Sequence, residues 1–172
     1  MGLGSRFLTV VAFAAAIGAC GQPPAKPALT KDALVGSWRL VSEEARSSSG
    51  RTTAQYGPKP TGRLMYDAAG RVSAHLVDPG VKRFVSGDLY VFTPDEVKAA
   101  FSGYFGYFGT YTVDTAAGTV THHVRGASFP NYVGTDQTRF VKLSGDRLEL
   151  ATQPQKEGGE ELTTYLVWER EH

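Results

Sequence analysis

From residue 34 onward, the chain is a series of short runs in which apolar and polar positions alternate. The runs are rich in β-branched and aromatic residues, and turn-forming residues separate them. Such runs are typical of antiparallel strands that bury one face. We predict about eight strands, over residues 38–44, 63–66, 71–77, 105–113, 119–125, 138–143, 147–151 and 162–169.

Short turns join neighbouring runs as hairpins. Asp67-Ala68-Ala69-Gly70 separates the second and third runs, and Ser144-Gly145-Asp146 separates the sixth and seventh. These residue types favour tight turns. Strands at this spacing predict an all-β fold, an antiparallel sandwich or barrel, in a single domain.

One segment carries helical signals instead. Thr93-Pro94-Asp95-Glu96 is a capping box with a proline in the first turn. Val97, Ala100 and Phe101 follow at the spacing of an apolar helical stripe. We predict one short helix that ends near Gly103 and either lies on the sheet or plugs one end of a barrel.

The N-terminal segment has the layout of an export signal. Arg6 precedes an apolar run over residues 7–19, and the small residues Gly18 and Ala19 stand immediately before Cys20. The run is shorter than the roughly 20 residues of a membrane-spanning helix, and its length suits a secretory signal. A plain cleaved signal and a short membrane anchor are the alternatives.

This junction resembles the lipobox of bacterial lipoproteins, although Ile17 stands where leucine is usual. The resemblance implies that Cys20 becomes the lipid-modified first residue, with acyl chains such as palmitate, and attaches the mature protein to the membrane. We expect a signal peptide over residues 1–19, a Pro-rich linker over 20–33 and a barrel domain over 34–172. The expected location is the outer membrane, facing the periplasm.

The charge balance and the cysteine count exclude several classes of protein. The chain has 18 basic and 17 acidic residues, and loss of the signal removes Arg6 from this balance. A neutral chain without basic clusters lacks the electrostatic footprint of a nucleic-acid-binding protein.

Since Cys20 is the single cysteine, an internal disulfide and a cysteine-based metal site are excluded. No dinucleotide, phosphate-loop or serine-elbow motif occurs, and we expect no cofactor.

Strand alternation predicts which side chains face the interior. Successive residues point to opposite faces, and charged positions such as Lys142 and Glu169 set the phase. The inward-facing set is apolar apart from a few polar side chains, which suits a small-molecule site. We predict that a ligand is contacted by Tyr107, Tyr111, His122, Gln137, Arg139 and Leu166.

The polar candidates also have structural interpretations. His122 is either a general acid or base or a hydrogen-bonded core histidine. Arg139 either reaches a ligand or pairs with Asp136, Glu161 or a carbonyl of a neighbouring strand. The tyrosines are either core residues or site residues. His122 and His123 point to opposite faces, so they cannot hold one metal ion together, and we predict no metal site.

Gly36-Ser37-Trp38 resembles the Gly-x-Trp signature that opens lipocalin barrels. The resemblance implies that Trp38 closes the barrel floor against a basic residue of a late strand. Arg170, two residues after Trp168, is the candidate partner, and a guanidinium over an indole ring contributes about 0.5–2 kcal/mol. We therefore expect structural roles for Gly36, Trp38 and Arg170.

A longer set of motifs resembles the bacterial lipocalin-like domain family. The matching segments are Ser86-Gly87-Asp88, the capping box, Tyr107-Phe108-Gly109-Thr110-Tyr111, Thr121-His122-His123-Val124, Pro130-Asn131-Tyr132-Val133-Gly134, Gln137, Arg139 and Val167-Trp168-Glu169-Arg170. The resemblance covers residues 34–170. It implies a lipocalin-like barrel with a ligand-sized interior, and it names no activity, because such barrels serve both carriers and enzymes.

Two functions of different classes follow from these features. The leading hypothesis is a membrane-anchored protein that binds a small hydrophobic or amphipathic ligand inside the barrel. The alternative is an isomerase or cyclase acting on a hydrophobic small molecule, with His122 as acid or base. A barrel that is filled by its own side chains is a third interpretation, and the oligomeric state is left open.

Overall fold

The computed structural model describes residues 1, 29–157 and 159–172. The expected signal peptide, Cys20 and the first part of the linker lie outside the described residues. Within the described part of the chain, no helix is both long and apolar enough to cross a membrane.

The described residues form ten strands and three short helical segments. In chain order, these elements are α1 (Lys31–Leu34), β1 (Gly36–Ser47), β2 (Thr52–Thr53), β3 (Thr61–Tyr66), β4 (Arg71–Val77), α2 (Pro94–Ser102), β5 (Tyr104–Asp114), β6 (Thr119–Ala127), the 3-10 helix η1 (Pro130–Tyr132), β7 (Asp136–Ser144), β8 (Arg147–Thr152), β9 (Gln155–Glu157) and β10 (Glu160–Glu171).

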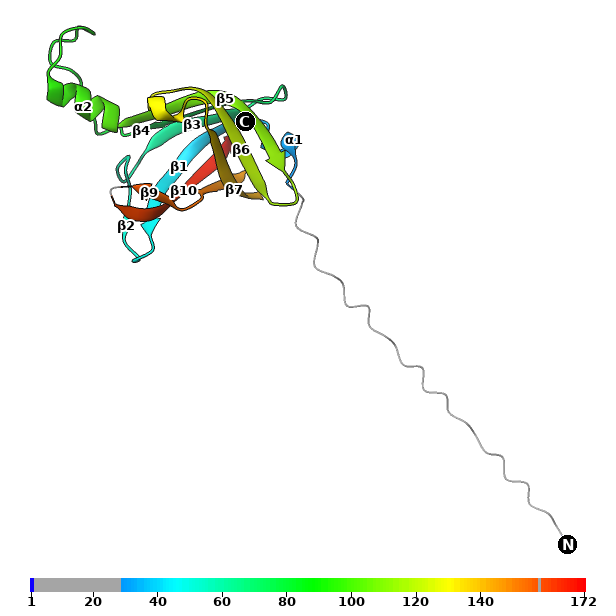
Figure 1. Cartoon of the computed structure of the whole chain (residues 1–172). Helices are drawn as coiled ribbons and strands as arrows, with labels where there is room; N and C mark the ends of the chain where they lie inside the picture. The colour runs from blue at the N-terminus through cyan, green and yellow to red at the C-terminus, as the bar shows by residue number, and fades with distance from the viewer. Residues whose placement is uncertain (2–28, 158) are drawn as a thin grey trace.

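Eight of the strands close into an antiparallel barrel (Figure 1). They pair in the order β1-β3-β4-β5-β6-β7-β8-β10, and β10 pairs again with β1. β2 and β9 are short extensions, paired with the end of β1 and the start of β10. The prediction of an all-β barrel of about eight strands is confirmed, since every predicted strand falls within an observed one.

Side chains alternate between the two faces of the wall as expected. In β6, Val120, His122 and Val124 are buried, whereas Arg125 is exposed. The buried apolar side chains of the strands meet in one core cluster inside the barrel. The alternation in the sequence therefore corresponds to a closed sheet whose inner face is buried.

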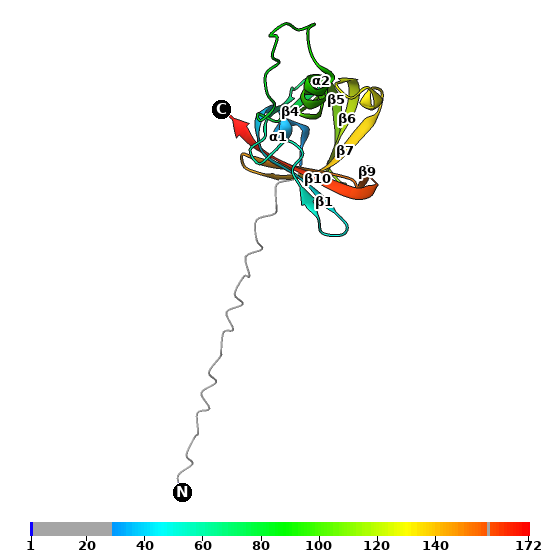
Figure 2. The ribbon, with the colours of Figure 1, turned by 90° about the vertical axis from the view of Figure 1, so that its left-hand side faces the viewer.

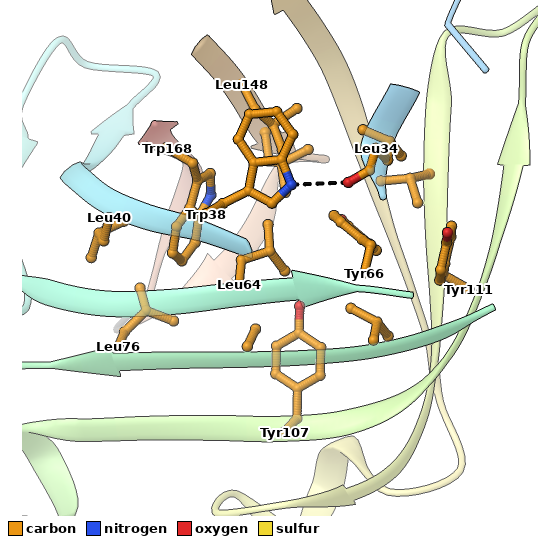
Figure 3. Close-up of a cluster of buried hydrophobic side chains, with 14 of the residues drawn as sticks. Leu34, Trp38, Leu40, Leu64, Tyr66, Leu76, Tyr107, Tyr111, Leu148 and Trp168 are labelled. Carbon is orange, nitrogen blue, oxygen red and sulfur yellow. Dashed lines mark hydrogen bonds between the residues drawn. The ribbon is translucent and has the colours of Figure 1, made fainter. Parts of the chain in front are cut away.

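One end of the barrel, which we call the floor, is closed by α1 and two side chains. The fully buried Trp38 donates from Nε1 to the Leu34 carbonyl at 2.9 Å (Figure 3). The Arg170 guanidinium lies 4.0 Å from the centroid of the Trp38 ring. Its Nη atoms donate to the carbonyls of Ala33 and Val35 at 2.8 and 2.7 Å. The contact expected from the Gly-x-Trp signature is present, and it fastens α1 across the floor.

Gly36 is needed for this contact. Its φ angle of 141° lies in the region that side chains other than glycine rarely adopt. A Cβ atom at this position would also lie 2.6 Å from Nη1 of Arg170. Any larger residue would therefore push the guanidinium away from the floor.

The domain includes residues before the expected boundary at residue 34. Thr30 caps α1 by accepting a hydrogen bond from the amide of Ala33 at 3.2 Å. Leu34 is fully buried, and Leu29 packs against the core cluster. The last part of the predicted linker is therefore part of the barrel floor.

α2 forms as expected from its capping box and stands at one end of the barrel. The Glu96 carboxylate accepts from the Thr93 amide at 2.7 Å, and Thr93 Oγ1 accepts from the Glu96 amide at 3.3 Å. None of its residues is buried, and it projects from the end of the barrel opposite α1 (Figures 1 and 2). Of the two positions expected for the helix, the face of the sheet is wrong. The helix stands at one end of the barrel, where Phe101 borders the cavity and lines a shallow apolar hollow with Val97 and Phe92.

Candidate functional site

The barrel encloses a cavity of about 590 Å³. Small-molecule sites commonly have volumes of about 300–1,000 Å³. The inner part of the cavity reaches Leu64 and Trp168, close to the floor (Figure 3). Its outer part is bounded by Phe101 and Phe129, both of which are exposed. The cavity therefore opens at the α2 end of the barrel, which we call the mouth.

The cavity wall is mainly aromatic and aliphatic. Its apolar contributors include Leu76, Phe105, Tyr107, Tyr132, Leu150 and Leu166. Its polar contributors include Glu43, Gln55, Arg139, Thr152 and Thr164. Phe105 makes edge contacts with Tyr107 and Tyr132 at centroid distances of 5.8 and 5.2 Å. Apolar walls with a few polar groups are suited to bind a small molecule and fix its orientation.

The structure divides the six predicted ligand contacts into two groups of three. The residues that line the cavity are Tyr107, Arg139 and Leu166. The residues that are buried outside its lining are Tyr111, His122 and Gln137. All six face the interior, so the division reflects depth and covering side chains rather than strand phase.

Tyr111 belongs to the closed end of the barrel. Its hydroxyl donates to the Asp67 carbonyl at 3.0 Å, and its ring meets the Tyr66 ring at a centroid distance of 4.7 Å. Lys31 of α1 lies 5.6 Å from the ring centroid. Burial raises the pKa of Tyr111. These contacts make Tyr111 part of the floor.

His122 is enclosed by two tyrosines. Its Nε2 atom lies 2.6 Å from the Tyr66 hydroxyl, and its Nδ1 atom lies 2.6 Å from the Tyr107 hydroxyl. Burial lowers the pKa of His122 from 6.5 to about 3, and the positive charge of Arg139 adds to this effect. The imidazole is therefore neutral at physiological pH, and it reaches the cavity through Tyr107.

The two tyrosines of this network also keep their protons. Burial raises the pKa of Tyr107 to about 12, and it raises the pKa of Tyr66 well above its ordinary value. The three side chains therefore form a neutral hydrogen-bonded chain from Tyr66 through His122 to the cavity wall.

Arg139 is the buried cation of the cavity wall, with 6% of its surface exposed. Its Nη1 atom donates to the Thr138 carbonyl at 3.0 Å, and its Nη2 atom donates to Oε1 of Gln137 at 3.5 Å. Gln137 in turn donates to Oγ1 of Thr135 at 2.8 Å. Gln137 therefore positions the guanidinium from outside the cavity lining.

The two carboxylates considered as partners of Arg139 lie elsewhere. Asp136 is on the outer face, where it bonds to Nδ1 of His123 at 2.7 Å. Glu161 is exposed near the start of β10. Among the described residues, no three histidine, cysteine, aspartate or glutamate side chains are grouped closely enough to hold a metal ion.

Glu43 is a cavity residue that the sequence pattern did not identify. It is 5% exposed, and its carboxylate accepts from the amide of Gln55 at 2.9 Å. Strict alternation from Trp38 would point Glu43 outward. The pairing register of β1 with β10, however, shifts between Leu40 and Ser42, and this bulge reverses the phase of the strand.

A closed antiparallel barrel with a tryptophan in its floor and a cavity open at one end belongs to the lipocalin class of architectures. Residues 35–171 match the family described as the lipocalin-like domain. This chain therefore belongs to the lipocalin-like domain family, and the membership expected from its motifs is confirmed.

Among curated proteins, the chain is similar to the 4'-hydroxy-3'-methoxypropiophenone carrier protein ppsC of Aspergillus oryzae (strain ATCC 42149 / RIB 40). The two are 34% identical over 106 residues, which cover 58% of this chain and 96% of that protein. Among solved structures, one similar chain is a lipocalin-like protein from Bacteroides uniformis ATCC 8492, with 16% identity, a TM-score of 0.42, and coverage of 81% of this chain and 99% of that chain. Another is an uncharacterized protein from Bacteroides eggerthii DSM 20697, with 15% identity, a TM-score of 0.39, and coverage of 80% and 99%.

Proposed function

We propose that this protein is a carrier that binds a small hydrophobic or amphipathic molecule inside its barrel. The observation that carries this proposal is the cavity of about 590 Å³ with a mainly aromatic and aliphatic wall. Family membership and the similarity to a carrier protein support a ligand-binding role. The name of that relative specifies an aromatic ketone, so an aromatic molecule of similar size is the first candidate to test.

The aromatic wall supplies the driving force for such a ligand. Phe105, Tyr107 and Tyr132 present packed ring faces and edges to the cavity, and aromatic pairs gain about 0.5–1.5 kcal/mol beyond the burial of their area. Burial of the ligand's own apolar surface contributes about 25 cal/mol per Å². A molecule with one ring and a short polar group fits these walls.

The test is a fluorescence titration of the purified protein with N-phenyl-1-naphthylamine, a neutral probe that emits strongly in apolar surroundings. We expect saturable binding of one probe per chain. If this protein and the Aspergillus carrier protein bind similar ligands, 4'-hydroxy-3'-methoxypropiophenone should displace the probe. Leu166→Trp, which fills part of the cavity, should weaken binding about ten-fold or more.

The control for this variant is Val167→Trp. Val167 is the next residue on β10 and is outside the cavity lining, so its replacement should leave the probe affinity unchanged. Equal affinities of the two variants would count against binding inside the barrel.

A second candidate function is an isomerase or cyclase that uses the cavity as a dry reaction chamber. The hydrogen bond between Tyr107, which lines the cavity, and His122 behind it favours this candidate. Since His122 is covered, an acid–base step would pass through the Tyr107 hydroxyl. A His122→Gln variant that keeps its probe affinity and loses turnover would support the enzyme over the carrier.

We also propose that Cys20 carries a lipid and holds the protein at the outer membrane, facing the periplasm. The support is the signal layout and the single cysteine before a proline-rich segment. Cys20→Ser should release the protein from the membrane fraction with its barrel folded, since Cys20 precedes the barrel domain. Fractionation and circular dichroism measure both outcomes, and a variant retained in the membrane would contradict the lipid anchor.

A further inference from the structure

Arg139 places a positive charge inside the barrel wall. Its two hydrogen bonds go to uncharged groups, the Thr138 carbonyl and the Gln137 side-chain oxygen. Among the side chains that the structure describes, no carboxylate lies within 4.0 Å of its nitrogen atoms. A buried charge is unfavourable unless a partner of opposite charge is supplied. The cavity is the side from which such a partner can approach.

The Tyr107 hydroxyl is a second donor available to the cavity. The described residues give the buried Tyr66 hydroxyl a single hydrogen bond, to Nε2 of His122. A proton on Nε2 would leave the Tyr66 O–H without an acceptor. A proton on Nδ1 instead lets Tyr66 donate to Nε2 while Nδ1 donates to the Tyr107 oxygen.

Each arrangement leaves one tyrosine O–H without an acceptor in the network. The second arrangement is favoured because this O–H then belongs to Tyr107, which lines the cavity, and not to Tyr66, which lies outside its lining. The hydrogen bonds then run in one direction, from Tyr66 to His122 to Tyr107. The O–H of Tyr107 remains to donate into the cavity that this residue lines.

Arg139 and Tyr107 both line the cavity. Burial raises the pKa of Tyr107 to about 12, and the charge of Arg139 opposes this rise. Trp168 also lines the cavity, and its Nε1 atom has no hydrogen-bond partner among the described residues. That nitrogen is itself buried, so it does not offer a hydrogen bond to the cavity.

The carboxylate that lines the described cavity is Glu43, and it enters from another part of the wall. β1, which carries Glu43, is separated from β7, which carries Arg139, by β10 and β8. The Glu43 carboxylate accepts from the Gln55 amide at 2.9 Å. Among the described residues, the Arg139 guanidinium is hydrogen-bonded to uncharged groups.

We propose that Arg139 and Tyr107 form a subsite for the carboxylate of an amphipathic acid, so that the barrel prefers acids to neutral molecules of the same shape. This inference rests on the proposed carrier function. The guanidinium offers N–H groups and its charge to the carboxylate oxygens, and the Tyr107 O–H donates a further bond. The apolar body of the acid lies against Phe105, Tyr132 and Leu166.

The test compares cis-parinaric acid, a fluorescent polyene acid, with its methyl ester at neutral pH. We expect the acid to bind about 10–100-fold more tightly than the ester, since hydrogen bonds to charged groups are the stronger kind. Arg139→Met retains the apolar stem without the charge and should lower the affinity for the acid to about that for the ester, so that the preference is lost. Arg125→Met, on the exposed face of β6, is the matched control and should keep the preference.

Each outcome separates the two proposals. Equal affinities of acid and ester for the unaltered protein would overturn the carboxylate subsite and leave the carrier function standing. If neither cis-parinaric acid nor its methyl ester binds, and N-phenyl-1-naphthylamine does not bind either, the result would count against the carrier function itself. If Arg139→Met does not fold, Tyr107→Phe replaces it, and an unchanged acid-to-ester ratio in that variant overturns the subsite.

Discussion

Replacing Trp38 with alanine is expected to lower the free energy of unfolding by about 3–5 kcal/mol. Trp38 is fully buried, so its removal leaves a void in the floor. The change also takes the donor from the Leu34 carbonyl and the ring from beneath Arg170. Since domains are stable by only about 5–15 kcal/mol, this variant should be close to unfolding. Urea titration followed by circular dichroism measures the loss.

Trp168 provides the matched control for this prediction. It is as deeply buried as Trp38, but its Nε1 atom has no hydrogen-bond partner among the described residues. Trp168→Phe therefore removes ring area alone, whereas Trp38→Phe also leaves the Leu34 carbonyl unpaired. Trp38→Phe should cost about 1–2 kcal/mol more. Equal losses would mean that the floor contacts of Trp38 contribute nothing beyond its volume.

Acidification is expected to destabilise the barrel through His122. The pKa of His122 is about 3 in the folded protein, against 6.5 for an ordinary histidine. Below pH 6.5 the unfolded chain binds a proton that the folded protein does not. The free energy of unfolding therefore falls by about 1.4 kcal/mol per pH unit until the folded-state pKa is reached. Above pH 6.5 the ring is neutral in both states, and this dependence disappears.

Urea titrations at a series of pH values measure this slope. His122→Gln has no titratable ring and should lose most of it, while His172→Gln, at an exposed position, should keep it. In the unaltered protein, NMR of the His122 ring should show a neutral imidazole well below pH 6.5. Protonation of that ring near its ordinary pKa would refute the prediction directly.

The strands and the inward-facing residues could be predicted because both depend on local alternation. In β7, the exposed Lys142 sets a phase that correctly buries Arg139 and Gln137. The floor contact could be predicted because Gly36-Ser37-Trp38 is a short signature with a known partner type. Each of these signals lies within a few consecutive residues.

The reach of each side chain into the cavity could not be predicted in this way. His122 faces inward as expected, but Tyr66 of β3 and Tyr107 of β5 cover it. Those partners are distant in sequence, and no local pattern marks their contact with β6. The bulge in β1 likewise depends on its pairing with β10, which is why Glu43 was not identified.

α2 shows the same division between local and distant information. Its capping box could be predicted because the interacting groups of Thr93 and Glu96 are three residues apart. Its position could not, because an apolar stripe indicates that a face will meet apolar partners without indicating which ones. Here Val97 and Phe101 of the stripe line a shallow hollow with Phe92 and stay exposed.

The pairing of β1 with β10 places the beginning and the end of the barrel at the same end of the domain. β1 runs from the floor to the mouth and β10 returns, so Ser37 and Glu171 stand opposite each other at the floor, joined by a 2.6 Å hydrogen bond (Figure 1). The described barrel therefore begins and ends on the side away from the cavity opening. A fusion partner or a surface joined directly after residue 172 would leave the route of ligand exchange unobstructed.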